Sequence, residues 1–213
     1  MTTTGPEPAG PNQPEDDPSR PSGATPSHHQ ESPLAEWLEA QMFDRRVIWI
    51  RGRLDDLVAT AAATQLMTLD GSGDDPIQLN LNSGEGTLSA ALILMDTIAA
   101  LGVPVKAVCI GRAEGPSLGV LAVAHRRLAA SHSRLRLHGE AIISAGTAAP
   151  MAHELAQQQR EIERFIAHVA QVTQQPAERV EIDLASRRYF DVEEALQYHL
   201  IDGIWRGTAP ANG

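Results

Sequence analysis

The sequence contains one cysteine and one lysine, and it has no basic stripe and no long apolar run. The single cysteine, Cys109, excludes an internal disulfide and a cysteine-based zinc site. Because it stands in an apolar stretch, Cys109 is most simply a small buried hydrophobic residue. The net charge of −10 argues against a nucleic-acid-binding surface, which requires clustered basic residues.

Signals for export, membrane insertion and metal binding are missing as well. The amino terminus is polar throughout, so we expect neither a signal peptide nor a membrane-spanning segment. A cytoplasmic location is the default expectation, with no membrane partner. The histidines lack the spacing to cysteines or acids that metal sites need, so we expect no metal and no other cofactor.

The prolines divide the chain of 213 residues. Its first 33 residues hold eight of the fourteen prolines and five acids against one arginine, without any apolar period. Such a composition cannot bury enough apolar surface to offset the entropy lost on ordering, which predicts a disordered tail at 1–33. Residues 34–208 are rich in Ala, Leu, Val and Ile and predict one domain, followed by a flexible terminus at 209–213.

Apolar periodicity predicts alternating helices and strands in this domain. A helix at 34–43 precedes a strand at 47–51, a helix capped by Asp55, a strand at 77–81, a loop at 82–86 and a helix at 87–101. A strand at 105–110 then runs into a glycine turn, with Pro116 at the first position of the next helix. This alternation favours parallel pairing with right-handed crossovers.

The carboxyl-terminal half adds a strand at 134–138, a long helix at 151–172 and a last helix with a capping box of Asp191 and Glu194. One apolar stripe runs along the long helix and comprises Met151, Leu155, Ile162, Phe165, Ile166 and Val169. A projecting helix would bury this stripe against another subunit, and packing on its own domain is the alternative. The pairs Arg126/Arg127 and Arg134/Arg136 are expected on solvated faces or in ion pairs between subunits.

Several short stretches follow one another as they do in a known peptidase family. Leu81-Asn82-Ser83-Gly84-Glu85-Gly86 stands where that family has Ile-Asn-Ser-Pro-Gly-Gly, and residues 46–52, 95–97, 134–138 and 195–202 also match in order. Residues 38–205 therefore resemble the proteolytic subunit of Clp protease, a serine peptidase of the crotonase-like fold. The resemblance implies an α/β fold of stacked ββα units, with a parallel sheet and a projecting long helix.

The resemblance also implies where the catalytic triad would lie. The family's serine stands in Gly-x-Ala-x-Ser-x-Gly, and without gaps this motif places the serine at Gly115. The family's histidine falls on His138, and its aspartate on Arg187 if Asp183 is the first acid of Asp-x-x-x-Asp. Glycine cannot attack a carbonyl, and arginine cannot orient an imidazolium, so two triad positions are lost and His138 would be vestigial.

The implied oxyanion hole is affected too. Its two backbone N–H donors fall on Gly86 and Pro116, and proline has no N–H. Loss of one such donor costs roughly 10²–10³ in rate. Glu85 and Glu114 would add negative charge near a developing oxyanion. The resemblance thus implies a degenerate subunit, with other Clp proteolytic subunits in homo- or hetero-oligomeric rings and an AAA+ unfoldase as partners.

Two other hypotheses remain open at this point. In the first, Ser117 is the nucleophile of an active serine endopeptidase, with His138 as base and Asp183 or Asp191 as the acid. In the second, the chain is a crotonase-like acyl-CoA enzyme that uses Glu85 and Glu114 as acid and base.

Overall fold

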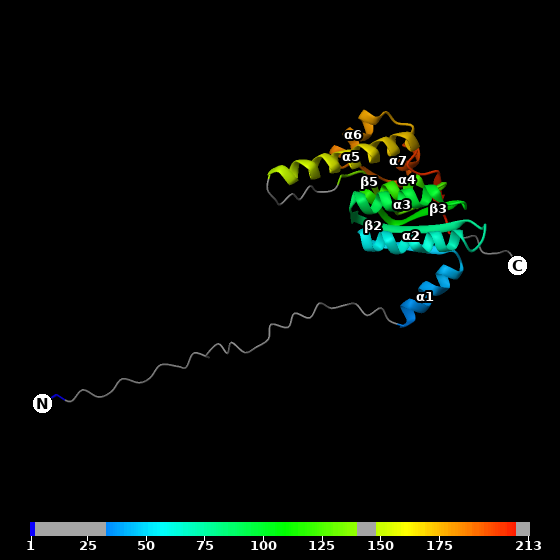
Figure 1. Ribbon diagram of the computed structural model, residues 1–213, viewed down its shortest axis with the longest axis horizontal. Helices are drawn as coiled ribbons and strands as arrows, with labels where there is room; N and C mark the ends of the chain where they lie inside the picture. Colours follow the sequence, from blue (N-terminus) through cyan, green and yellow to red (C-terminus); the bar gives the residue numbers. More distant parts are fainter. Residues whose placement is uncertain (3–32, 140–147, 208–213) are drawn as a thin grey trace.

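A computed structural model describes residues 1–2, 33–139 and 148–207. The predicted tail lies outside the described residues except at its two ends, and the predicted flexible terminus at 209–213 lies wholly outside them. The described residues form an α/β fold with a layer of helices on a mostly parallel sheet, as predicted (Figure 1).

The sheet has seven strands. They are β1 (Val47–Leu54), β2 (Ile77–Gly86), β3 (Val105–Glu114), β4 (Arg126–Ala130), β5 (Arg134–Arg136), β6 (Tyr189–Phe190) and β7 (Gly203–Trp205). The parallel order is β1-β2-β3-β4-β7, and β6 runs antiparallel to β5. β3 pairs with β4 along its first half and with β5 along its second half, so β5 lies beside the end of β3.

The helices are α1 (Pro33–Asp44), α2 (Asp56–Asp70), α3 (Leu88–Ala100), α4 (Pro116–Val123), α5 (Ala148–Thr173), α6 (Ala177–Ala185) and α7 (Val192–Gln197). Four of the helices, α2, α3, α4 and α7, begin where local side chains favour a helix start. Asp55 caps α2 and Thr87 caps α3, each by accepting a hydrogen bond from a backbone N–H. The predicted capping box of Asp191 and Glu194 is confirmed, and so is Pro116 in the first turn of α4.

Three strands extend further than the sequence predicted, and one is shorter. β1 continues past Arg51 to Leu54, whereas β5 ends at Arg136, two residues before the predicted end. Residues 82–86 and 111–114 were expected as a loop and a turn, but they continue β2 and β3. After an irregularity that follows Leu81, the pairing resumes with Ser83 opposite Ala113. Glycines in both stretches hide the strand pattern, because glycine weakens a strand without forbidding it. The elements β4, α6, β6 and β7 were not predicted at all.

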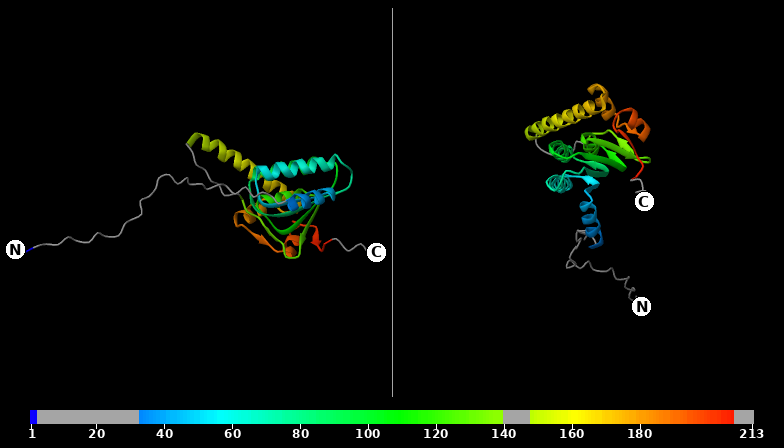
Figure 2. Two further views of the ribbon diagram at one scale, coloured as in Figure 1. Left: turned by 90° about the horizontal axis from the view of Figure 1, so that it is seen from below. Right: turned by 90° about the vertical axis from the view of Figure 1, so that its right-hand side faces the viewer.

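The two faces of the sheet are covered unequally. α2 and α3 pack side by side over one face, with α4 next to α3 (Figures 1 and 2). Ile48 and Ile50 of β1 point into that layer and are fully buried, whereas Val47 and Trp49 between them are only half-buried. The alternation shows that β1 has one packed face and one partly open face.

The long helix α5 divides into two parts. Its amino-terminal part extends beyond the sheet, whereas its carboxyl-terminal part packs on α4 and α6 (Figure 1). Phe165 and Val169 are buried in the chain's own core, and Ile162 and Ile166 pack against it, so these four residues follow the own-domain alternative. Leu155 stays exposed, and the side chain of Met151 lies outside those described. No described helix, α5 included, is long and apolar enough to cross a membrane.

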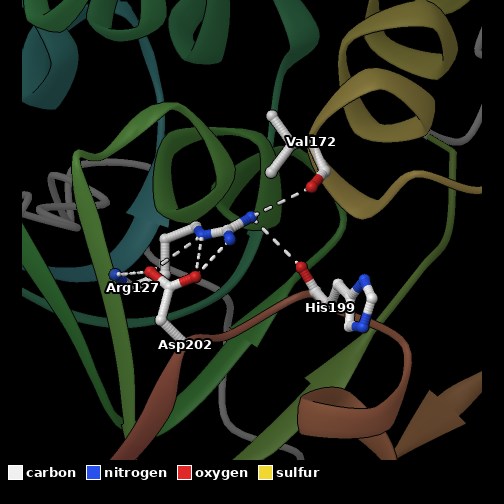
Figure 3. Close-up of polar contacts among 4 residues, drawn as sticks. All are labelled: Arg127, Val172, His199 and Asp202. Carbon is white, nitrogen blue, oxygen red and sulfur yellow. Dashed lines mark hydrogen bonds and ion pairs between the residues drawn. The ribbon is translucent and has the colours of Figure 1, made fainter.

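Arg127 of β4 contacts α5 and the loop between α7 and β7 (Figure 3). Its guanidinium forms an ion pair with Asp202, and one of its nitrogens also donates to the carbonyls of Val172 and His199. Burial alone would raise the pKa of Asp202, but the hydrogen bonds from Arg127 lower it below its ordinary value. The expectation for this arginine is corrected: Arg127 pairs within its own chain and ties β4 to α5 and to the loop that precedes β7.

Candidate active site

Gly115 occupies the sharp turn between β3 and α4. Its φ of 56° and ψ of −124° are a backbone conformation that glycine adopts easily and that strains other residues. The Gly115 N–H donates to the Arg136 carbonyl at 2.9 Å, so β5 holds the turn in place. A sharp strand-to-helix turn of this kind presents the side chain of its central residue to the end of a sheet.

His138 lies directly opposite this turn. A β-carbon added to Gly115 would stand 2.7 Å from Cε1 and 2.8 Å from Nε2 of the His138 ring. Such distances are shorter than ordinary contacts, so the imidazole fills the space that a side chain at Gly115 would need. The structure therefore brings together the two positions that the motif alignment assigned to nucleophile and base.

The imidazole of His138 contacts no carboxylate among the described residues. Its Nδ1 lies 2.9 Å from the carbonyl oxygen of Gly139, its neighbour in the chain. A base in a triad instead needs an acid at that nitrogen, to orient the ring and stabilise its positive form. Arg187, the position assigned to the family's aspartate, is exposed at the end of α6 with a positive φ of 55°.

The two acids considered as substitutes have other partners. Asp183 is buried and accepts hydrogen bonds from Arg179, Arg188 and the Tyr198 hydroxyl. Burial raises the pKa of Tyr198, and its hydrogen bond to the Asp183 carboxylate raises it further. Asp191 accepts from the N–H of Glu194 as the cap of α7. Both carboxylates thus hold the carboxyl-terminal elements together.

Ser117 is fully buried and bonded to backbone groups. Its oxygen accepts from the Glu114 N–H at 2.9 Å and lies 2.9 Å from the carbonyls of Ser83 and Glu114. One hydroxyl proton can serve only one of these carbonyls at a time, yet every polar neighbour is main chain. Ser117 thereby links the start of α4 to the ends of β2 and β3.

The positions assigned to the oxyanion hole adjoin this turn. Pro116 opens α4 and brings no N–H to it. At Gly86, an added β-carbon would stand 2.5 Å from the carbonyl oxygen of Leu54, so only glycine fits between β1 and β2. The chain keeps one of the two implied donor positions and has lost the other.

The two glutamates near the site are both paired with arginines. Glu114 is buried, with Arg134 at 3.4 Å and Arg136 at 3.9 Å. Arg136 also stacks over the ring of Tyr189 at 4.4 Å. Arg134 is exposed, as expected of a residue on a solvated face, whereas Arg136 is half-buried and pairs within its own chain, which corrects the expectation for Arg136.

Glu85 is exposed and lies 3.7 Å from Arg53. Cys109 is fully buried in β3, and burial raises the pKa of its thiol to about 12, as expected of a residue that only packs. No cluster of three metal-ligating side chains occurs in the described ranges. His125 accepts a hydrogen bond from the Val105 N–H at 3.2 Å, which gives this histidine a structural partner.

Comparison with known proteins identifies the family of this chain. A family model described as Clp protease matches residues 31–208. The chain belongs to the Clp protease family. It is 31% identical over 169 residues to ATP-dependent Clp protease proteolytic subunit 4 of Rhodococcus jostii, which covers 78% of this chain and 87% of that relative.

Two further Clp protease relatives are about equally similar. ATP-dependent Clp protease proteolytic subunit 1 of Corynebacterium glutamicum is 30% identical over 173 residues, which cover 78% of this chain and 82% of the relative. A chloroplastic protein of Arabidopsis thaliana, named as Clp proteolytic subunit-related protein 2, is 31% identical over 186 residues, which cover 85% of this chain and 67% of that protein. The likeness thus extends to subunits and to a subunit-related protein.

Several contacts at this Clp protease site were not predicted from the sequence. The carbonyls of Gly139 and Arg136, which hold His138 and Gly115, are main-chain groups and carry no sequence signal. The pairing of Glu114 with arginines on β5 was only weakly indicated by the sequence. An acid at the end of one strand could match basic residues on a strand expected nearby.

Proposed function

We propose that this chain is a Clp proteolytic subunit that does not cleave peptides itself and that assembles with active subunits. The observation that carries the proposal is the pair of Gly115 and His138. Glycine stands at the turn where a nucleophile would face the imidazole, and it has no side chain to supply one. Pro116 agrees with this interpretation, and so does the lack of an acid beside His138 in the part of the chain that the structure describes.

The alternative with Ser117 as nucleophile is disfavoured by the contacts of that residue. A nucleophilic hydroxyl must reach both its base and the substrate, whereas Ser117 is fully buried and bonded to main-chain groups of β2 and β3. The acyl-CoA hypothesis loses ground for a different reason, because the family match is to Clp protease. Its proposed acid and base, Glu85 and Glu114, are also engaged with arginines.

A fluorophosphonate probe tests the catalytic part of the proposal. The purified full chain should remain unlabelled and should not cleave a fluorogenic peptide, whereas an active Clp proteolytic subunit treated in parallel should do both. Ser117→Ala is the matched variant. Labelling of the wild type that disappears in Ser117→Ala would overturn the proposal and establish Ser117 as the nucleophile.

Assembly is tested by native mass measurement of the chain mixed with an active Clp subunit. We expect mixed oligomers, and we expect Leu155→Glu to weaken them because Leu155 is the exposed apolar residue of the projecting part of α5. Ala156→Glu adds the same charge one position along and serves as the control. A chain that stays monomeric in every mixture would contradict the ring role. A cytoplasmic location and an AAA+ partner belong to the same proposal.

A further inference from the structure

A groove with a volume of about 770 Å³ begins at the edge of the sheet opposite the candidate active site and extends over the face that α2 and α3 do not cover, as far as Ile110 and Trp205. The first residues of four parallel strands line it: Val47, Ile77, Val105 and Arg126. Parallel strands begin at one edge and end at the other, and Gly115 follows the last residue of β3. The groove and the Gly115 turn are therefore separate features, and nothing above uses the groove.

Tryptophans form part of the groove wall. Trp49 of β1 and Trp205 of β7 both line it, and both are half-buried. They are two of the three tryptophans in the chain. Rigid aromatic rings that remain partly accessible on a concave surface are the usual platform for proline rings, whose extended segments fit between them.

Cations complete the lining. Arg45, Arg46, Lys106 and Arg126 line the groove, and no acidic residue does, although the whole chain carries a net charge of −10. None of the four forms an ion pair among the described residues. Arg46 donates to Ser72 and to a backbone carbonyl, but these neutral partners leave its charge uncompensated. The groove therefore suits an acidic ligand that also carries apolar rings.

We propose that this groove binds the chain's own amino-terminal segment at residues 8–17. The segment reads Pro8-Ala9-Gly10-Pro11-Asn12-Gln13-Pro14-Glu15-Asp16-Asp17. In an extended polyproline helix of three residues per turn, its three prolines lie on one side and can contact the two tryptophans. The three acids that follow then meet the cations of the groove. Both features of the groove are thus matched within ten consecutive residues.

The length of the chain permits this contact. Fifteen residues lie between Asp17 and Pro33, and an extended chain of that length spans about 50 Å. The helix α1 has 12 residues, which is a length of about 18 Å, and Met42 near its end lines the groove. Because the segment and the groove belong to one chain, the effective concentration is in the millimolar range and modest contacts suffice. Any partner that binds this face must displace the segment.

Lys106 allows a direct test, because it is the only lysine of the chain and it lines the groove. A carbodiimide joins its amine to a carboxylate by an amide bond, with loss of one water. In the full chain at low concentration, we expect mass spectrometry of the digest to identify Lys106 coupled to Glu15, Asp16 or Asp17. The coupled product should keep the mass of a single chain.

Charge variants and proline variants sharpen the test. Arg45→Glu on the exposed rim should lower the coupling about threefold, and added salt should do the same, whereas Arg164→Glu on α5 should leave it unchanged. Pro11→Ala combined with Pro14→Ala should also lower it, in contrast to the control pair Pro21→Ala and Pro26→Ala. Coupling confined to cross-linked dimers would assign the groove to a second copy and overturn the proposal. Coupling that Arg45→Glu does not change would overturn it as well.

Discussion

At the carboxyl edge of the sheet, Gly115 and His138 face each other with no room for a further side chain. At the amino edge, two tryptophans and four cations line a groove of about 770 Å³. The first edge engages its polar groups with neighbours in the chain, through the carbonyls of Gly139 and Arg136 and the ion pairs of Glu114, although Oε1 of Glu114 and Nε of Arg136 make no hydrogen bond. The four cations of the second edge form no ion pair among the described residues. The edge that corresponds to an active site, with Gly115 and His138, thus has no free space for a ligand. The edge without catalytic residues has a groove that a ligand can enter.

This contrast predicts that substitutions at the carboxyl edge destabilise the fold more than substitutions at the amino edge. Gly86→Ala should have the largest effect, about 3 kcal/mol of unfolding free energy, because its β-carbon would stand 2.5 Å from the Leu54 carbonyl oxygen. Urea unfolding measures the change. Gly71→Ala is the control, since its nearest atom would be 3.7 Å away and its φ is −72°. Equal losses for both variants would contradict the crowded geometry.

Gly115→Ser should destabilise by about 2 kcal/mol and should not create peptidase activity. The left-handed φ of Gly115 strains a serine, and the new side chain meets the His138 ring. In a double-mutant cycle, His138→Ala should recover the part of the loss that comes from this contact. Fluorophosphonate labelling of Gly115→Ser would mean that the ring can move aside and that the edge is less closed than we infer.

Ser117→Ala should destabilise by about 1–2 kcal/mol, because the buried Glu114 N–H loses its acceptor. Thermal unfolding measures this, with Ser89→Ala at an exposed position as the control. We expect no change in the peptide-cleavage background. A loss no larger than that of Ser89→Ala would show that Ser117 has no structural role.

The smallest effect is expected at Asp202, which pairs with Arg127 near the amino edge. The folded-state pKa of Asp202 is lowered below its ordinary value of 3.8, so its ionised form favours folding. This contribution is complete above the unfolded-state pKa and is lost as pH falls through the folded-state value. The stability difference between wild type and Arg127→Met should therefore shrink below about pH 4. Unfolding curves from pH 7 to 3 test this, and Arg164→Met should show no such change.

Local chemistry made the helix starts predictable. Asp55, Asp191 and Pro116 act within the first turn of their helices, so a few residues of sequence are enough to predict these helix starts. Strand extent was harder to predict, because the ends of β2 and β3 depend on partners distant in sequence and contain glycines. The short strands β4 and β7 pair with each other, and the Arg127 N–H donates to Asp202 just before β7. These contacts join residues far apart in the sequence, so no local pattern predicts the two strands.

For the candidate site, the motif resemblance identified Gly115 and His138 as facing positions although 23 residues separate them. It could not show that Asp183 is committed to Arg179, Arg188 and Tyr198, because that cluster depends on how α6 and α7 pack. Nor could it show the buried state of Glu114. The stripe on α5 was recognised, but periodicity alone does not say which neighbour covers each half of a helix.

Cys109 can report when the central strands of the sheet separate. It is the sole thiol, and it lies fully buried in the central strand β3, paired on both sides with β2 and β4. A membrane-permeant alkylating reagent can modify it only when those strands separate. The rate of alkylation in a living cell would thus measure how often the sheet opens. A partner that stabilises the fold by binding would lower this rate.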